Sequence, residues 1–523
     1  MSTDRLLRLA RALADPAVLG HPIERVEIIQ THISVVLLTG RFAYKLKKPL
    51  ALGFIDCSTL ERRRHLCEEE LRLNRRLAPD LYLEVLAILG SVEEPRLAGA
   101  GEPIEYAVRM REFPQQALLD RVLARGGLGA DLLAGFAERI AAFHAAAAIA
   151  GTGDAFGSAG AVRDQALGAF EQLDDALLGE PTLSAVARLR AHLDAQSSAL
   201  GADFERRRAA GRVRECHGDL HLTNMLLIDG RIEVFDCIDF NADLRWTDVA
   251  AEIAFLAMDL DVRGRADLGT AFLNAWLCAT GDYDALAVLG FYRIYRSIIR
   301  AKVAALRAAQ AQAGGGTDAA AVDRAREHVA LAARYAFPAA APVLIVTHGL
   351  SGCGKSWLAA RLSAHTGAIW IRSDVERKRL AGLAAGARSG SGIGTGLYGV
   401  PMSDRTYARL RDCAAAALRG GFSAIVDATF LERGQRASFA RLARDLGVSF
   451  GVLWLRAPDA VLADRVAGRA AQAQDPSEAD AAVIEFQRLR AEPPDAGETG
   501  HTIAVDTAAG IDIAALAARI AAL

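Results

Sequence analysis

The stretch "GLSGCGKS", Gly349 to Ser356, constrains the fold more than any other part of this chain. The apolar run "VLIVTH" precedes it, and the helix-like run "SWLAARLSAH" begins at its last residue. Glycines allow the backbone to curl so that several N–H groups point at one anion, and the start of the following helix adds positive partial charge. The sequence therefore predicts a phosphate-binding loop between a strand and a helix.

Two side chains of this loop have the chemistry that a nucleotide phosphate requires. Lys355 is expected to reach the outer phosphates and to act in catalysis, and Ser356 is expected to bind Mg²⁺. The remaining nucleotide-binding positions of the loop are expected to act through the backbone. They are Gly349, Ser351, Gly352, Cys353 and Gly354.

The segment after residue 338 alternates short apolar runs with helical segments. The apolar runs are "VLIVTHG", "AIWIRSD", "SAIVDATF", "FGVLWLRA" and "HTIAVDT". This alternation predicts an α/β domain with a parallel sheet and helices on both faces. A chain of 523 residues is long for one core, and the stretch "FPAAAP" resembles a linker. We therefore predict domains at residues 1–337 and 338–523.

Charged residues follow the second and third of these apolar runs. In a parallel sheet, ligands bind beyond the carboxyl ends of the strands. Asp374 is expected to accept the proton of an attacking hydroxyl, and Arg377 to hold an anionic group during transfer. A helix cap is the alternative role for Asp374. Asp427 is expected to bind Mg²⁺, directly or through water.

Arg465 and Arg469 lie four residues apart in "DRVAGRAAQ", on one face of a predicted helix. One hypothesis is that the pair closes over the nucleotide phosphates as a lid and stabilises the charge that develops during transfer. The alternative is an ordinary solvated helix face.

With these motifs, the segment from Ala341 to Leu523 resembles the small P-loop kinases: gluconate kinase, chloramphenicol phosphotransferase, zeta toxin and the kinase domain of polynucleotide kinase. The resemblance rests on the phosphate-binding loop, on the "SD..R" after the second strand, on "VDAT" and on the two arginines. It implies a P-loop NTPase fold and ATP-dependent phosphorylation of a hydroxyl group.

A second constellation is "HGDLHLTNMLLIDGRIEVFD", from His217 to Asp236, in which polar residues flank a short apolar run. It resembles the catalytic core of aminoglycoside phosphotransferases, choline kinases and fructosamine kinases, which share their fold with protein kinases. The resemblance covers roughly Val26 to Ala336. It implies an α+β, protein-kinase-like bilobal fold for the N-terminal half.

The resemblance also implies a role for each acidic or amide residue of this constellation. Asp219 matches the catalytic aspartate, and Asn224 matches the metal-binding asparagine. Asp236 matches the metal-binding aspartate, with Asp239 as the alternative. Asp248, in "WTDVAAEIAF", matches a later structural aspartate. Such a set would place one carboxylate beside the acceptor hydroxyl and two ligands on Mg²⁺.

A kinase-like fold further needs a strand lysine that orients the phosphates and a helix glutamate that holds the lysine. "AYKLKKP" offers Lys45 and Lys47, which share one face of a strand because side chains alternate. Lys45 is the first choice, and Lys47 is nearly equal. Glu70 is the expected nucleotide-site partner, with Glu69 as the alternative.

Two further segments complete the predicted nucleotide site of this half. "VRMREF", Val108 to Phe113, is expected to be the hinge that meets adenine, with Met110 among the nucleotide-binding residues. The run "HISVVLLTGRFAYKLKKP" predicts a hairpin around a Thr39–Gly40 turn. We expect this turn to be the nucleotide-covering loop between the first two strands, with Gly40 as its one glycine.

These observations lead to one main hypothesis and two alternatives. The main hypothesis is a fused phosphotransferase with two kinase-type sites that use ATP and Mg²⁺ and act on hydroxyls of small polar molecules, such as a sugar, an amino sugar or a related metabolite. In the first alternative, the N-terminal half is a regulatory nucleotide-binding module. In the second, the C-terminal half phosphorylates nucleic-acid ends, for which "RSDVERKRL" would supply positive charge.

Composition argues against several other classes. The net charge is −2, so no global positive field favours nucleic acid or an anionic membrane. The seven cysteines contain no CxxC pair, which argues against a zinc site or a disulfide framework. No uncharged apolar run approaches the ~20 residues of a membrane span. Because the N-terminus also lacks a signal-peptide core, we expect a cytoplasmic protein.

Overall fold

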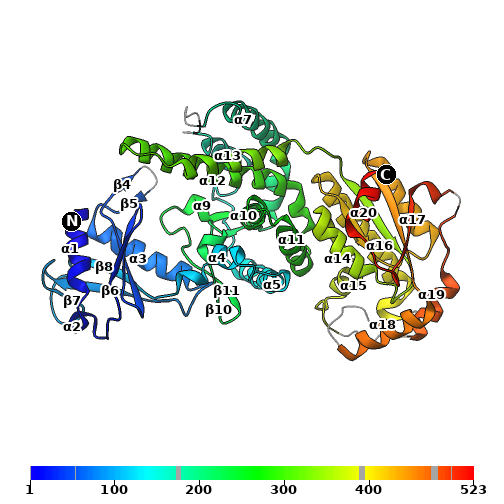
Figure 1. Cartoon of the computed structure of the whole chain (residues 1–523), viewed down its shortest axis with the longest axis horizontal. Coiled ribbons are helices and arrows are strands. Elements are labelled where there is room, and N and C mark those ends of the chain that lie inside the picture. The colour runs from blue at the N-terminus through cyan, green and yellow to red at the C-terminus, as the bar shows by residue number, and fades with distance from the viewer. Residues whose placement is uncertain are drawn as a thin grey trace. The chain divides into compact units, whose positions relative to one another are not determined.

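The computed structural model describes residues 2–52, 55–171, 173, 178–387, 395–472, 481–495 and 497–523. The chain divides into two compact units (Figure 1). The first unit comprises Met1–Leu132, Ala142–Ser158 and Arg206–Leu256, and the second comprises Leu133–Ala141, Ala159–Glu205 and Ala257–Leu523. The second unit therefore contains helices that precede residue 338, and the boundary at residues 337 and 338 stays a prediction.

The first unit contains an antiparallel sheet covered by a helix. Its strand order is β1 (Glu27–Gln30), β2 (Ser34–Leu38), β3 (Phe42–Lys47), β8 (Glu105–Arg111), β6 (Tyr82–Gly90) and β7 (Pro95–Arg96). Helix α3 (Leu60–Asn74) packs against β8 and β6. It begins at Thr59, whose hydroxyl accepts a hydrogen bond from the Arg62 backbone N–H.

The predicted hairpin around Thr39 and Gly40 is present, but it does not join the first two strands of the sheet as expected, and its role as the nucleotide-covering loop stays a prediction. A further strand, β1, precedes it, so the loop between the first two strands is residues 31–33. The sequence did not reveal β1 because its four residues, "EIIQ", include only two apolar side chains. The loop that joins the first two strands, Thr31, His32 and Ile33, contains no glycine.

Short hairpins and a helix follow the sheet within the first unit. Strands β9 (Val213–Glu215) and β12 (Trp246–Asp248) pair with each other, as do β10 (Met225–Ile228) and β11 (Arg231–Val234). Helix α10 (Val249–Val262) begins directly after β12 and is buried over most of its length. The other elements of the N-terminal half up to here are α1 (Thr3–Leu13), α2 (Pro16–Leu19), β4 (Ala51–Leu52), β5 (Ile55–Asp56), α4 (Leu119–Ala124), α5 (Ala130–Ala146), α6 (Ala159–Gly168), α7 (Thr182–Ala199), α8 (Gly201–Ala209) and α9 (Ala242–Arg245).

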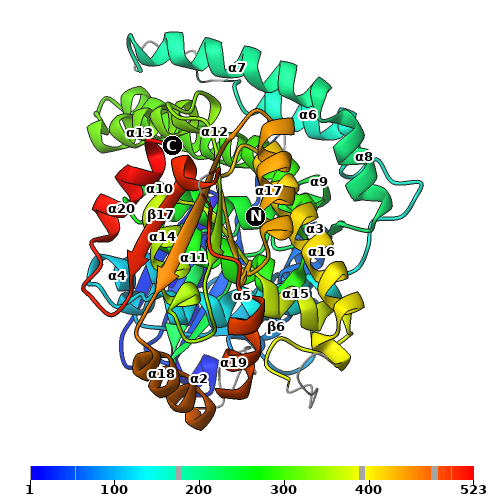
Figure 2. The same ribbon diagram turned by 90° about the vertical axis from the view of Figure 1, so that its right-hand side faces the viewer.

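The second unit contains the predicted parallel sheet, with helices on both faces. Its strand order is β14 (Ile369–Arg372), β15 (Ala424–Asp427), β13 (Val343–His348), β16 (Ser449–Arg456) and β17 (Thr502–Asp506). Figure 2 shows α14 (Lys355–Thr366) and α20 (Ile513–Ala521) on one side of it, and α16 (Val400–Arg419) and α17 (Arg433–Asp445) on the other. All five strands match the five predicted apolar runs.

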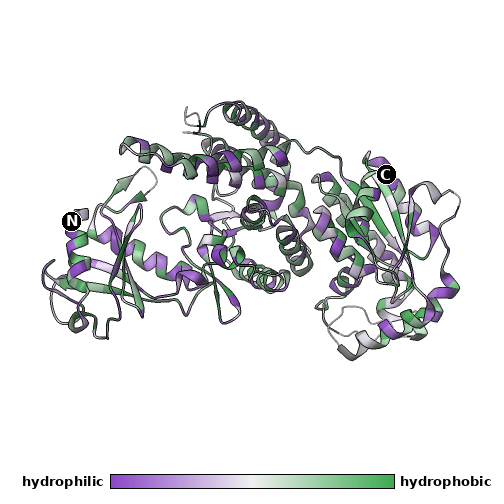
Figure 3. Cartoon of the chain, in the orientation of Figure 1, coloured by the Kyte–Doolittle hydropathy of each residue, from purple (hydrophilic) through white to green (hydrophobic). Residues whose placement is uncertain are grey.

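The core of this sheet follows from its sequence. The central strands β13 and β15 are apolar runs with both faces covered, as is typical of parallel sheets, and Figure 3 shows the sheet largely in the green of apolar residues. Strand β14 lies at one edge of the sheet. Helix α15 (Ser373–Leu380) follows it immediately, and α18 (Asp459–Gln472) and α19 (Ala481–Arg490) lie between β16 and β17 in the chain.

Besides α6 and α7, three later helices from before residue 338 also belong to the second unit. They are α11 (Ala266–Thr280), α12 (Leu286–Ala313) and α13 (Ala319–Ala336). The last two form an antiparallel pair with extensive contact, and α11 packs against α14 and the edge strand β14. Sequence reasoning did not foresee the contact of α11 with the C-terminal sheet.

Candidate active sites

The first candidate site is built around an ion-paired lysine of β3. Lys45 Nζ lies 2.7 Å from Glu70 Oε1, on α3, and 2.6 Å from Asp236 Oδ1, which follows β11. Glu70 is buried, whereas the Asp236 side chain is 51% exposed. The lysine therefore joins a buried anchor to a carboxylate that is open to a ligand.

Lys47 forms a second, fully buried arrangement on the same face of β3. Its ammonium lies 2.6 Å from Glu70 Oε2 and also contacts the Asp239 carboxylate. Lys47 and Asp239 are both buried, so this pair has little access to a ligand. Of the alternatives that the sequence left open, the geometry places Lys45 and Asp236 at the open side and Lys47 and Asp239 behind them.

The electrostatics of this cluster follow from burial opposed by ion pairing. Burial alone would raise the pKa of the Glu70 carboxyl, but the ammonium groups of Lys45 and Lys47 hold that pKa below its usual range, at about 2. Burial lowers and the neighbouring carboxylates raise the pKa of Lys45, with the result well above its ordinary value. Glu70 is therefore ionised and Lys45 charged at neutral pH.

Asp219 and Asn224 meet at the start of the β10–β11 hairpin. Asn224 Nδ2 donates to Asp219 Oδ2 at 2.9 Å, and the His221 imidazole donates to the same oxygen at 3.1 Å. The hydroxyl of Thr223 lies 2.8 Å from the other ring nitrogen of His221. The Asp219 side chain remains 34% exposed, so it is oriented by its partners and still open to an acceptor group.

The hairpin brings Asn224 and Asp236 to its two ends. The Phe235 backbone N–H donates to the Asn224 carbonyl at 3.0 Å, directly beside Asp236. Asp236 has a φ of 62°, a left-handed conformation that is uncommon outside glycine and occurs at functional sites. Its backbone N–H donates to the Tyr82 hydroxyl at 3.1 Å, which holds this conformation.

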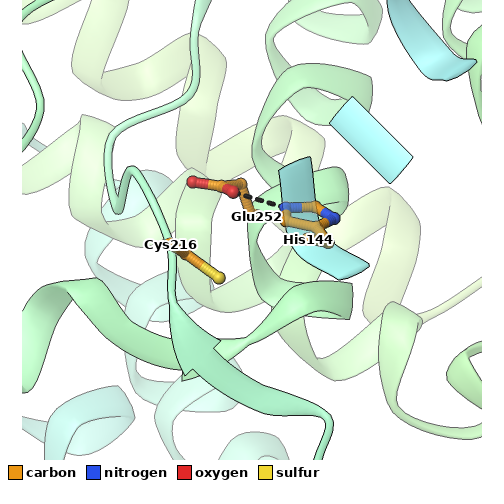
Figure 4. Close-up of side chains that lie close together, drawn as sticks. All are labelled: His144, Cys216 and Glu252. Atoms are coloured by element: carbon orange, nitrogen blue, oxygen red, sulfur yellow. Dashed lines mark hydrogen bonds and ion pairs between the residues drawn. The ribbon is translucent and has the colours of Figure 1, made fainter. Parts of the chain in front are cut away.

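A buried carboxylate that the sequence did not reveal anchors the segment before Asp219. Glu252 Oε1, on α10, accepts the backbone N–H groups of His217 at 2.6 Å and Gly218 at 2.9 Å. Its other oxygen lies 2.6 Å from His144 Nε2 (Figure 4). Burial raises the pKa of Glu252, but the hydrogen bond from His144, the charges of His144 and His217, and the Gly218 N–H lower it to about 2.

Figure 4 also shows the Cys216 thiol next to this pair. The ligand atoms of His144, Cys216 and Glu252 all lie within 4.8 Å of one another. Because the Glu252 carboxylate already accepts three hydrogen bonds, we interpret the group as an anchor for the loop. The His217 imidazole adds a second anchor, donating to the Phe235 carbonyl at 2.9 Å.

The expected adenine-binding region is apolar. Met110 on β8 belongs to a buried cluster with Ala43 and Leu226, and Phe113 packs against Phe235 with ring centroids 5.2 Å apart. The turn at Thr39 and Gly40 lies beside the hinge, where both backbone N–H groups donate to the Glu112 carboxylate at 3.0 and 2.7 Å.

Two other predicted residues of this half have structural contacts. The Asp248 carboxylate accepts two hydrogen bonds from the buried Arg207 guanidinium, at 2.6 and 2.8 Å, which fits its expected structural role. Glu69 pairs with Arg72 on the outer side of α3, at 2.8 Å. Of the two candidate glutamates, Glu70 therefore contacts the lysines, and Glu69 does not.

The second candidate site is the loop from Gly349 to Ser356, between β13 and α14. Gly349, Gly352 and Gly354 all have positive φ, at 151°, 86° and 85°. A Cβ at Gly352 would lie 2.8 Å from the Leu462 carbonyl oxygen, so only glycine fits. The loop therefore curls under the N-terminus of α14, as a phosphate cradle requires.

Three polar side chains converge on this cradle. Lys355 Nζ donates to the Gly349 and Leu350 carbonyls at 2.9 and 2.8 Å. The Ser356 hydroxyl donates to Asp427, at the end of β15. Trp370 Nε1 donates to Asp427 Oδ2 at 3.1 Å. Burial raises the pKa of Asp427, and the hydrogen bond from Ser356 and the charge of Lys355 oppose that rise.

Gln487, on α19, is a further contact of the loop that the sequence did not reveal. Its Oε1 accepts the Ser351 backbone N–H at 2.8 Å, and its Nε2 donates to the Ser351 hydroxyl at 3.0 Å. Arg465 donates to the Gly352 carbonyl at 3.4 Å and to Thr507 Oγ1 at 2.9 Å. Arg465 thus supports the loop backbone here, and its predicted lid role stays a prediction. The side chain of Arg469 lies outside the described residues.

Asp374 and Arg377 lie one helical turn apart on α15, which directly follows the edge strand β14. Asp374 is in the first turn of the helix, partly exposed. The Arg377 guanidinium donates to the Leu397 carbonyl at 3.0 Å and to the Ser403 hydroxyl at 3.3 Å, and it stacks on Tyr398. Lys378 is buried and donates to the Ala385 carbonyl at 3.2 Å. Arg377 and Lys378 are therefore both engaged by polar groups of the protein itself.

The donor sets of both sites suit Mg²⁺. One offers the Asn224 amide and the Asp236 carboxylate at the two ends of a hairpin, and the other offers Ser356 hydrogen-bonded to Asp427. Carboxylate, amide and hydroxyl oxygens are the ligands that this hard cation prefers. The residues present therefore fit the ion.

Comparison with family models matches each half to a different family. Residues 57–289 match the model described as "Phosphotransferase enzyme family", and residues 344–494 match a model described as "AAA domain". Proteins of Mycobacterium tuberculosis and Mycobacterium bovis, each described as an uncharacterized protein, are 31% identical over 496 residues. The alignment covers 94% of this chain and 94% of each relative. The chain belongs to their family.

Solved structures resemble one half or the other. A gluconokinase from Sinorhizobium meliloti is 21% identical, with a TM-score of 0.25, over 35% of this chain and 91% of that one. A glucosamine kinase is 20% identical, with a TM-score of 0.37, over 61% and 78%. A choline/ethanolamine kinase family protein from Mesorhizobium loti is 15% identical, with a TM-score of 0.37, over 64% and 99%.

The family can therefore be described by its two domains. A kinase-like phosphotransferase domain is fused to a small P-loop kinase domain, which confirms the two resemblances found in the sequence. Both domain types imply the use of ATP, and the first implies a small-molecule substrate. Among the described residues, no helix is both long and apolar enough to cross a membrane.

Proposed function

We propose that this chain is an ATP-dependent phosphotransferase in which both sites carry out chemistry, each transferring the γ-phosphate of ATP to a hydroxyl of a small polar molecule. One observation carries the proposal. Each half holds a complete set of the groups that phosphoryl transfer needs: a lysine for the phosphates, oxygen ligands for Mg²⁺ and an accessible aspartate for the acceptor.

In the N-terminal half, Asp219 is the group that accepts the proton of the acceptor hydroxyl. Its orientation by Asn224 and His221 fixes the carboxylate, and its exposure leaves room for the acceptor. Lys45, held by buried Glu70, positions the phosphates of ATP. Mg²⁺, when bound by Asn224 and Asp236, supplies compensation for the negative charge of the phosphates.

In the C-terminal half, the backbone N–H groups of the loop and Lys355 bind the phosphates. The contacts of Lys355 with two loop carbonyls keep its ammonium at the cradle until a phosphate replaces them. Asp427 keeps Ser356 oriented for the metal. Asp374 accepts the acceptor proton, and Arg377 holds the anionic group.

The acceptor class follows from the chemistry of these sites. Both offer a single carboxylate base and a strongly polar surround, which suits a hydroxylated metabolite such as a sugar or an amino sugar. The alternative of nucleic-acid ends has less support, because Arg377, Lys378 and Arg379 already bind carbonyl, hydroxyl and carboxylate groups of the protein.

The test separates the two sites in the full-length protein. Wild type, Asp219→Ala, Lys355→Ala and the surface control Asp131→Asn are incubated with Mg²⁺, γ-³²P-labelled ATP and a pooled metabolite extract, and the labelled products are resolved by mass. We expect at least two labelled products, one lost with each site variant and neither lost with the control. A wild type that labels no small molecule, with an extract that supports known sugar kinases, would overturn the proposal.

A second candidate function has a specific observation in its favour. The loop that joins the first two strands, residues 31–33, lacks glycine, and the N–H groups of Thr39 and Gly40 are occupied by Glu112. In this second candidate function, the N-terminal half binds nucleotide without turnover and regulates the P-loop site. Loss of label with Lys355→Ala alone, together with ATP binding that Lys45→Met abolishes, would favour this candidate.

A further inference from the structure

Helix α11, which lies within the segment matched to the phosphotransferase family, completes the exposed edge of the P-loop sheet. Asn274 Oδ1 accepts the Trp370 backbone N–H of β14 at 2.8 Å, and Asn274 Nδ2 donates to the Ala368 carbonyl at 3.3 Å. The same Nδ2 also donates to the Ser363 hydroxyl at 2.9 Å. One buried amide thus pairs with the edge strand on both sides of a residue, much as a neighbouring strand would.

The C-terminal end of α11 contacts the helix that follows β14. The last carbonyls of any helix have no partner within it and carry negative partial charge. Here the Arg379 guanidinium, from α15, donates to the Cys278 and Ala279 carbonyls. Arg409, from α16, donates to the Gly281 carbonyl at 2.8 Å.

Both guanidinium groups are joined on their other side by one carboxylate of α15. Glu376 is completely buried, and it accepts hydrogen bonds from Arg379 at 3.2 Å and from Arg409 at 3.0 Å. Glu376 lies between Asp374 and Arg377 in the sequence, so the Arg379–Glu376–Arg409 cluster holds the helical turn that carries the proposed base and the proposed anion-binding group. Because a buried carboxylate is costly without cationic partners, loss of either arginine should disturb this turn.

The hydrogen bond between Asn274 and β14 also links α11 to Asp427, the proposed metal-binding carboxylate of the site. Trp370, whose backbone N–H is bound by Asn274, donates its indole N–H to Asp427. Asp427 in turn accepts the hydroxyl hydrogen bond of Ser356. Helix α11 thus supports β14 and Asp427 through Asn274. It supports α15 through the carbonyl groups at its own C-terminal end.

We propose that α11 is a positioning element of the P-loop site, which acts through Asn274 on β14 and through the Arg379–Glu376–Arg409 cluster on α15. This inference rests on the proposed function of that site. The predicted consequence is selective: the acceptor side of the site depends on α11, whereas the phosphate cradle, which is formed by the β13–α14 loop, does not.

Hydrogen–deuterium exchange of the full-length protein tests the positioning directly. The variants are Asn274→Ala, Arg409→Gln and the conservative Arg409→Lys. The control is Asp267→Asn, which breaks a surface pair with Arg265 on the same helix. We expect exchange in residues 369–380 to be about tenfold faster in the first two, partly restored by Arg409→Lys, and unchanged in the control and in α14. Unchanged exchange of residues 369–380 in both variants would overturn the proposal.

Activity then separates positioning from simple loss of structure. For the product that Lys355→Ala abolishes, Arg409→Gln should raise the acceptor KM by about tenfold and leave the ATP KM within about twofold. Equal changes in both constants would count against the proposal. Absence of any Lys355-dependent product in wild type would instead refute the proposed function, while the exchange experiment would still decide whether α11 holds α15.

Discussion

The two phosphate sites of this chain are built by opposite means. The N-terminal site consists of charged side chains from β3, α3 and the β10–β11 hairpin, and its order comes from ion pairs such as Lys45 with Glu70 and Asp236. The phosphate cradle of the C-terminal site is formed mainly by backbone, curled by three glycines with positive φ, to which Lys355 and Ser356 add their side chains. A site made of side chains is sensitive to the loss of a charge, and a site made of backbone is sensitive to an added atom.

The largest contrast is expected between the two lysines of β3. Lys47→Met leaves Asp239 buried without its partner and should lower the free energy of unfolding by about 3–5 kcal/mol. Lys45 lies at the open side of the cluster, so Lys45→Met should lower the free energy of unfolding by less. It should, however, reduce the Asp219-dependent turnover about a hundredfold. Chemical denaturation and product formation measure both. A variant Lys47→Met that folds normally and fails in turnover would reverse the assignment.

Acid should destabilise the P-loop half through one buried histidine. Burial lowers the pKa of His348 to about 4, so its stabilising contribution is complete above the unfolded pKa of about 6.5 and is lost as the pH falls towards 4. Glu70, with a pKa held at about 2, loses its contribution only between about pH 4.5 and 2. Hence the P-loop half should lose up to about 3 kcal/mol between pH 7 and 4.

The control for this prediction is His348→Gln, which cannot titrate. Its unfolding free energy should depend less steeply on pH over this range than that of wild type, whatever its absolute level. Parallel curves for the two proteins, measured by denaturation at half-unit pH steps, would show that His348 is not the cause.

One added methyl group should damage the backbone-built site. Gly352→Ala combines a φ of 86° with a Cβ only 2.8 Å from the Leu462 carbonyl oxygen. Strain of about 1–3 kcal/mol should weaken ATP binding at this site by roughly ten- to a hundredfold. Gly434→Ala, in α17 with open space around it, is the matched control and should bind normally. Calorimetric titration with ATP in a Lys45→Met background, in which the N-terminal site no longer binds ATP, measures the difference.

The smallest effect is expected for the loop anchor of the charge-built site. Glu252→Gln keeps an oxygen for the His217 and Gly218 N–H groups but loses the charge that faces His144. The kcat of the Asp219-dependent reaction should fall about tenfold. Glu138→Gln, on the exposed face of the same helix as His144, should change neither reaction. An equal loss in the Lys355-dependent reaction would indicate general destabilisation.

The two sites also differ in how far the sequence predicts them, because one is a contiguous loop and the other gathers side chains from distant segments. The cradle is contiguous, so residue types at fixed spacing from Gly349 to Ser356 were enough to predict its position between a strand and a helix. The fold class was likewise predictable, because strand and helix periodicities are local. In contrast, Lys45 and Lys47 share a strand face, and the two-residue period cannot tell which of them meets the open side.

The supporting contacts were not predictable, for a physical reason. Glu252 meets His144 across 108 residues, and neither lies in a recognisable pattern. The strand β1 was missed because four residues with two apolar side chains carry no periodic signal. Asn274 looks like an ordinary polar residue of an apolar helix until β14 lies beside it. Such contacts depend on tertiary packing.

The pairing of Asn274 with an edge strand has a consequence for how the gene itself can be divided. A fragment that starts after residue 338 leaves the backbone of β14 without its cover, and an uncovered edge strand is a template for pairing with another chain. We therefore expect a fragment that begins at residue 338 to aggregate more readily than the full chain.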